Sequence, residues 1–98
     1  MIRHVLFVKF KDNIDSKDLL EARNAFSHIP NQIQGISGFE WGENTSTEGL
    51  SQEFTHCIQI VFADEQARQR YLIHPEHQKL KSTLFKVLEK IIVVDYTI

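Results

Sequence analysis

The sequence has one cysteine, no long apolar run and no excess of basic residues, and each shortage excludes a class of protein. The single thiol, Cys57, has no partner for an internal disulfide, and the chain opens on Met1 and a β-like segment, so we expect a cytoplasmic protein. The longest apolar runs, Val5–Val8 and Ile91–Val94, are far shorter than the ~20 residues of a membrane-spanning helix. A formal net charge of −2 gives no basic field to attract nucleic acid or an anionic membrane.

Motifs that would bring a cofactor are also missing. There is no glycine-rich phosphate loop, no nucleophile elbow and no Cys-x-x-Cys pair. No histidines have the His-x-His or His-x-x-x-His spacing of metal ligands, since His74 and His77 are three apart across a proline. We therefore expect neither a metal nor a cofactor, and the partners that remain are small molecules and proteins.

What the sequence does contain is the periodicity of one α+β domain over residues 1–98. A chain of 98 residues, 42% hydrophobic and 24% charged, can bury a single core. Apolar residues at helical spacing after Asp15 and Asp64 predict two helices, the second interrupted at Pro75. Alternating apolar residues predict strands at 2–10, 39–44, 53–62 and 91–98, with a polar loop at 45–52.

The order β-α-β-β-α-β is that of the ferredoxin-like fold, an antiparallel four-stranded sheet with its helices on one face. The other face would then be bare. Its expected residues are all apolar: Val5, Phe7, Cys57, Val61, Ile91 and Val93. Because such a face normally marks an interface, we predict a homodimer through the sheet faces, involving Val5, Phe7, Val61 and Val93.

The most unusual local feature is His74-Pro75-Glu76-His77, which follows Tyr71 directly and straddles the helix break. His77 would lie near the positive end of its helix, where the dipole disfavours the imidazolium, so we expect a neutral ring that can act as a general base. Tyr71 would face inward and donate a hydrogen bond to an oxygen that gains negative charge. The alternative is that His77 satisfies backbone groups at the helix start and that Tyr71 is core.

Two further histidines face inward on otherwise apolar strands, where a buried imidazole needs a partner. If the second helix runs back along the third strand, His56 becomes a neighbour of Tyr71 and His77, and we predict that the three share one cavity. Strand geometry places His4 toward the far end, as a pocket-wall residue. We assign Phe26 and Trp41 to the wall of the ligand pocket as well.

The sequence resembles the stress-responsive A/B barrel (Dabb) family over nearly its whole length. The segments that carry the resemblance are Ile2–Lys11, Trp41–Ser46, Phe54–His56, Tyr71–His77 and Val94–Tyr96. The resemblance implies a dimer in which two ferredoxin-like sheets form an α+β barrel. One branch of the family, the plant polyketide cyclases, performs an intramolecular aldol cyclisation. Its catalytic tyrosine and histidine are similar to Tyr71 and His77, and its supporting histidines to His4 and His56.

Three functions follow as hypotheses. The first is a dimeric Dabb protein whose pocket binds a small carbonyl compound, with His77 removing a proton next to the carbonyl and Tyr71 stabilising the enolate. The second is a non-catalytic stress-response or assembly protein whose histidines hold the core. The third is a cofactor-free monooxygenase-like relative that oxidises quinol-type aromatics.

Overall fold

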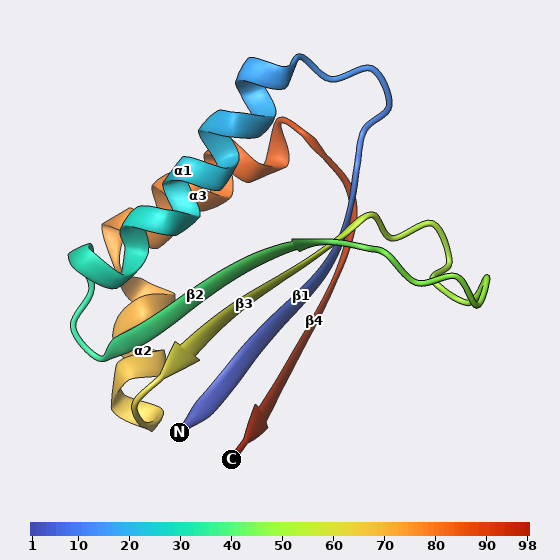
Figure 1. Cartoon of the computed structure of the whole chain (residues 1–98). Helices are drawn as coiled ribbons and strands as arrows, with labels where there is room; N and C mark the ends of the chain where they lie inside the picture. Colours follow the sequence, from blue (N-terminus) through green and yellow to red (C-terminus); the bar gives the residue numbers. More distant parts are fainter.

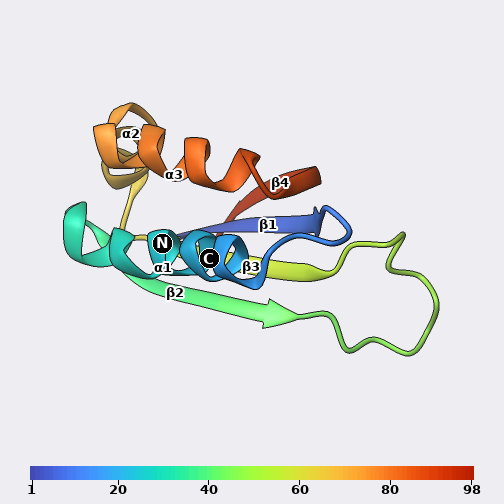
Figure 2. The same ribbon diagram turned by 90° about the horizontal axis from the view of Figure 1, so that it is seen from above.

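The chain folds into a four-stranded antiparallel sheet with all three helices on one face (Figure 1). The computed structural model describes all 98 residues. In chain order the elements are β1 (Ile2–Phe10), α1 (Ser16–Gln32), β2 (Ile36–Glu43), β3 (His56–Phe62), α2 (Glu65–Ile73), α3 (Pro75–Phe85) and β4 (Leu88–Thr97). The strand order β2-β3-β1-β4, which can be followed in Figure 2, is the predicted ferredoxin-like topology. The second helical segment is two helices, as the predicted interruption at Pro75 implies. None of the three helices has both the length and the hydropathy that a membrane-spanning helix requires.

Helix α1 begins and packs as its sequence predicts. The Asp15 side chain accepts a hydrogen bond from the backbone N–H of Lys17 at 2.9 Å, which satisfies one of the free donors of the first turn. Ala22, Phe26 and Ile29 recur at helical spacing and are buried against the sheet. The helix continues through Pro30 and ends at Gln32.

The break between α2 and α3 fixes the direction in which the chain returns. Asp64 caps α2 by accepting from the backbone N–H of Ala67 at 2.9 Å. His74 then caps α3, since its Nδ1 accepts from the backbone N–H of Glu76 at 3.0 Å, and Pro75 occupies the first turn, where its missing donor costs nothing. The turn folds α3 back so that His77 lies against Tyr71.

Helix α2 can approach the sheet closely because Gly35 lies beneath it. Gly35 has φ +91°, in the left-handed region, and a Cβ built there would lie 2.6 Å from the Cβ of Ala67. Ala67 is itself fully buried. Glycine at this turn therefore sets how closely α2 packs at this end of the sheet.

The outer face of the sheet, which no helix covers, is apolar as predicted, but one strand has the opposite phase. Val5, Phe7 and Val61 do point to this face, whereas Val93 does not. In the β1–β4 register Val93 is opposite Leu6, whose side chain is in the core, and Ile92 is opposite Phe7. The prediction for Val93, and for Ile91 with it, is wrong because an uninterrupted run of four apolar residues gives no alternation from which to read the phase. On β4 the residues of the outer face are Lys90, Ile92, Val94 and Tyr96.

Candidate active site

A cavity of about 270 Å³ lies between the sheet and the two C-terminal helices. Nine of its twelve lining residues are hydrophobic, and they include Leu6 of β1, Phe26 of α1 and Leu80 of α3. The polar residues of the wall are His4, His77 and Lys81. Such an apolar pocket with a few convergent polar groups is the usual form of a small-molecule site.

Tyr71 and His77 meet in this cavity. Their ring centroids are 4.1 Å apart, with 34° between the ring planes. Tyr71 is only 2% exposed, and its burial, together with the negative charge of Asp95, raises the pKa of its phenol well above the ordinary range. At neutral pH the phenol is therefore protonated and can donate a hydrogen bond.

The surroundings of His77 select one tautomer of its neutral ring. Its Nδ1 lies 3.3 Å from the backbone oxygen of Leu72, and because a carbonyl can only accept, the proton is on Nδ1. Nε2 then carries the free lone pair. Burial lowers the pKa of His77 below 6.5, the positive charge of Lys81 lowers it further, and the bond to Leu72 opposes this. The predicted direction is confirmed, and burial is its main cause.

His4 lines the cavity, in agreement with its assignment to the pocket wall, although strand geometry predicts a place toward the far end of the sheet. Its ring is 5.6 Å from that of Tyr71, centroid to centroid, and only 8% of the residue is exposed. Residue 2 of β1 pairs with Phe62 at the end of β3, so the start of β1 is next to the place where α2 begins. Strand geometry alone therefore predicts the wrong end of the sheet for His4.

Asp95 is a site residue that pattern reasoning missed. Its carboxylate accepts from Nδ1 of His4 at 2.7 Å and from Arg68 at 3.3 Å, and Arg68 also pairs with Glu65. Because a carboxylate can only accept, the bond to Asp95 places a proton on Nδ1 of His4. The signals in the sequence are its place in the resemblance segment Val94–Tyr96 and a carboxylate directly after the apolar run Ile91–Val94. Its partner depends on the β1–β4 register, in which Asp95 faces His4.

His56 and Trp41 lie elsewhere, so the prediction that His56 shares the cavity is wrong. The His56 ring packs edge-on against Trp41 and Phe10, with centroid distances of 5.5 Å and 4.9 Å. His56 is the first residue of β3, whereas Tyr71 contacts Phe62, the last residue of that strand. At ~3.3 Å per residue, His56 and Phe62 are about 20 Å apart. The error arose because α2 stays at the end of β3 and does not run back along it. His56 and Trp41 instead line a separate open groove of about 390 Å³ beside α1.

Phe26 lies between these two regions. It is 1% exposed, lines the cavity of Tyr71 and His77, and contacts Trp41 with 6.1 Å between ring centroids. The structure thus places Phe26, like His4, in the wall of this cavity, whereas Trp41 lines the separate groove beside α1.

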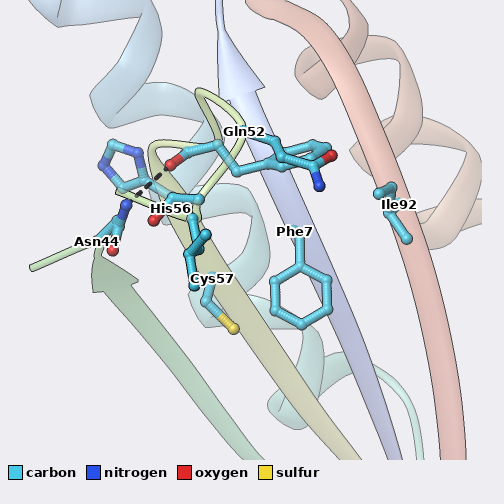
Figure 3. Close-up of a pocket in the computed structure, with 9 residues that line it drawn as sticks. Phe7, Asn44, Gln52, His56, Cys57 and Ile92 are labelled. Carbon is cyan, nitrogen blue, oxygen red and sulfur yellow. Dashed lines mark hydrogen bonds between the residues drawn. The ribbon is translucent and has the colours of Figure 1, made fainter. Parts of the chain in front are cut away.

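A larger hollow of about 400 Å³ opens on the outer sheet face, under the loop that joins β2 and β3. Figure 3 shows Phe7 and Cys57 side by side on neighbouring strands, with Ile92 beyond Phe7. Burial raises the pKa of the Cys57 thiol, so the nucleophilic thiolate is disfavoured there. No group of three or more His, Cys, Asp or Glu residues is placed to hold a metal ion.

Fold and cavity together define a ferredoxin-like domain with a histidine–tyrosine pair in an apolar pocket. The family model of the stress responsive A/B barrel domain, Dabb, matches residues 2–98, and the chain belongs to this family. A curated relative, the stress-response A/B barrel domain-containing protein HS1 of Arabidopsis thaliana, is 30% identical over 95 residues, covering 97% of this chain and 87% of the relative. Olivetolic acid cyclase of Cannabis sativa is 26% identical over 96 residues, 98% of this chain and 95% of the enzyme.

Solved structures show the same fold. A crystal structure of an Arabidopsis thaliana protein matches with a TM-score of 0.92 and 30% identity, covering 99% of this chain and 94% of that one. A hydroxynitrile lyase from Passiflora edulis matches with a TM-score of 0.91 over 99% of this chain and 92% of its own, and at 21% identity the likeness shows the fold alone. The same holds for a dimeric ferredoxin-like protein from Jannaschia, with a TM-score of 0.87 and 22% identity over 99% and 98% of the two chains.

Proposed function

We propose that this Dabb protein is an acid–base enzyme that removes a proton next to the carbonyl group of a small molecule. The observation that carries the proposal is the contact between Tyr71 and His77, 4.1 Å between ring centroids, in an apolar cavity. A neutral histidine with a free Nε2 and a protonated phenol beside it are the base and the oxyanion donor that enolate formation requires.

Three residues that line the cavity have defined tasks in this reaction. Nε2 of His77 takes the proton from the carbon acid, and the Tyr71 hydroxyl donates to the oxygen on which the enolate charge develops. His4, held by Asp95, positions the ligand through its own Nε2. The enolate is then reprotonated or attacks a second carbonyl carbon. The likeness to a relative named a cyclase supports this class of chemistry.

We further propose that the protein acts as a homodimer through the outer sheet face. Phe7, Ile92 and Val94 are between 39% and 46% exposed there in the single chain, and Val5 and Val61 lie among them. A contiguous apolar patch of this kind is rare on a monomer. Two such faces packed together would form the eight-stranded barrel for which the family is named.

The catalytic proposal is tested by solvent deuterium exchange into a panel of small ketones and keto acids, followed by NMR. The wild-type protein is expected to label the carbon next to the carbonyl, and His77→Gln is expected to abolish this labelling. His28→Gln, at an exposed histidine of α1, is the matched control and should exchange as the wild type does. Equal labelling by the wild type and His77→Gln, with only a stability loss of about 1 kcal/mol in the variant, would show that His77 is structural.

A further inference from the structure

Lys81 is a half-buried lysine in the wall of the cavity that forms no ion pair. It lines the pocket with His4 and His77, and no carboxylate lies within salt-bridge distance of its ammonium group. The preceding lysine of the same helix, Lys79, shows the ordinary arrangement, since it is exposed and pairs with Glu76 at 3.2 Å.

The position of Lys81 on α3 directs it toward the reacting groups. It follows His77 by four residues, so the two side chains lie on the same helix face with Cβ atoms about 5–6 Å apart. The effect of its charge on the pKa of His77 agrees with this proximity. The stem of a lysine can lie along apolar wall while the ammonium group stays near the cavity mouth.

The other charged groups around the cavity do not neutralise Lys81. The carboxylate of Asp95 is held by His4 and Arg68. Arg68 is in turn paired with Glu65. The cavity therefore offers a ligand one unpaired positive charge next to the base and the phenol.

We propose that Lys81 binds a carboxylate and that the substrates of this site are small keto acids, an inference that rests on the proposed proton abstraction. The carbonyl oxygen lies at Tyr71, the acidic carbon at Nε2 of His77, and the carboxylate, within about two carbons of that carbon, at Lys81. A cavity of about 270 Å³ is just below the 300–1,000 Å³ of typical ligand pockets, which favours a short chain or a single ring.

The lysine has a physical role in the proton transfer itself. When the C–H bond breaks, the proton moves to His77 and forms an imidazolium, and the electron pair moves to the carbonyl oxygen as an enolate that accepts a hydrogen bond from Tyr71. The ligand then carries two negative charges close together, and an ammonium group beside them lowers the energy of that state. Return of the proton from His77 restores the neutral base.

The test compares 4-oxopentanoate with its methyl ester, which share one carbon skeleton and differ in charge. Binding is measured by NMR from the ring signals of His77, and deuterium exchange at the carbons next to the ketone is measured in parallel. The acid is expected to bind the wild type about tenfold more tightly than the ester, as one partly buried charge-assisted hydrogen bond would give. Lys81→Met should reduce this preference to about one, and Lys79→Met should leave it unchanged.

The outcomes separate this inference from the proposed function. Equal binding of acid and ester, an acid preference that persists in Lys81→Met, or binding of neither compound overturns the keto-acid assignment. An acid preference that depends on Lys81, with no exchange at the carbon acid, supports the assignment and overturns the catalytic proposal. Exchange that requires His77 but is equal for the ester and the acid supports catalysis and overturns the role of Lys81.

Discussion

Replacing Phe7 with glutamate places a carboxylate in the middle of the outer sheet face. Phe7 is 39% exposed in the single chain, so packing on a second sheet would bury that remaining part of the ring. Since full burial of a phenylalanine is worth roughly 1.5–3 kcal/mol, the lost apolar contact amounts to about 1–2 kcal/mol for the two symmetric copies. Desolvation of each carboxylate adds several kcal/mol.

The expected sum is a loss of at least about 4 kcal/mol of dimerisation free energy, which weakens the dimer about a thousandfold. Sedimentation velocity over a range of concentrations, with circular dichroism to check the fold, measures this directly. Phe7→Glu should be a folded monomer, or unfolded if the single chain is too unstable. The matched control is Leu20→Glu, a change at a 56% exposed apolar residue of α1 on the opposite side of the sheet, which should leave the dimer intact.

A Phe7→Glu variant with the dissociation constant of the wild type would refute the assignment of this face. A wild-type chain that stays monomeric at high micromolar concentration would refute it equally. Val93→Glu is a useful comparison with Phe7→Glu. Because Val93 lines the cavity of Tyr71 and His77, this change should weaken ligand binding more than it weakens the dimer.

Three further predictions follow from the cavity and the turn beneath α2. Tyr71→Phe should slow deuterium exchange about a hundredfold, the loss typical of one oxyanion donor, and leave thermal stability nearly unchanged. The pKa of His77 is lower in the folded chain than its unfolded value of 6.5, so the stability that the neutral ring contributes should be complete above pH 6.5. This contribution should fall as the pH drops from 6.5 toward the folded pKa. Urea titrations of the wild type and His77→Gln at several pH values measure it as the difference between their free energies of unfolding. Gly35→Ala should lower the free energy of unfolding, measured by urea denaturation, by about 2 kcal/mol, because the new Cβ would meet Ala67. Gly49→Ala is the control, also at positive φ but with nothing within 4 Å, and should lower it less.

Local signals in the sequence predicted most of the fold. Asp15 and Asp64 cap the helices that follow them, and Pro75 marks the break that folds α3 back onto Tyr71. Each of these features depends on a few neighbouring residues, so it can be read without knowing what lies across the sheet. The meeting of Tyr71 and His77 follows from the same short segment.

Features that depend on strand pairing could not be predicted in the same way. The phase of β4, and with it the position of Val93, is set by its register with β1, and an apolar run is compatible with either phase. The contact between His4 and Asp95 arises from residues 91 apart in the chain. The separation of His56 from the cavity depends on how far α2 extends, which no residue of β3 encodes.

The claim that His77 is a neutral base beside a phenol donor is tested most directly by a ¹⁵N NMR titration of its imidazole ring in the free protein. At neutral pH the ring should carry its proton on Nδ1 and none on Nε2, with a pKa below 6.5. Tyr71→Phe should leave the tautomer unchanged, since the bond to Leu72 sets it. A ring protonated on Nε2, or a pKa above 6.5, would contradict the account whatever an activity assay reports.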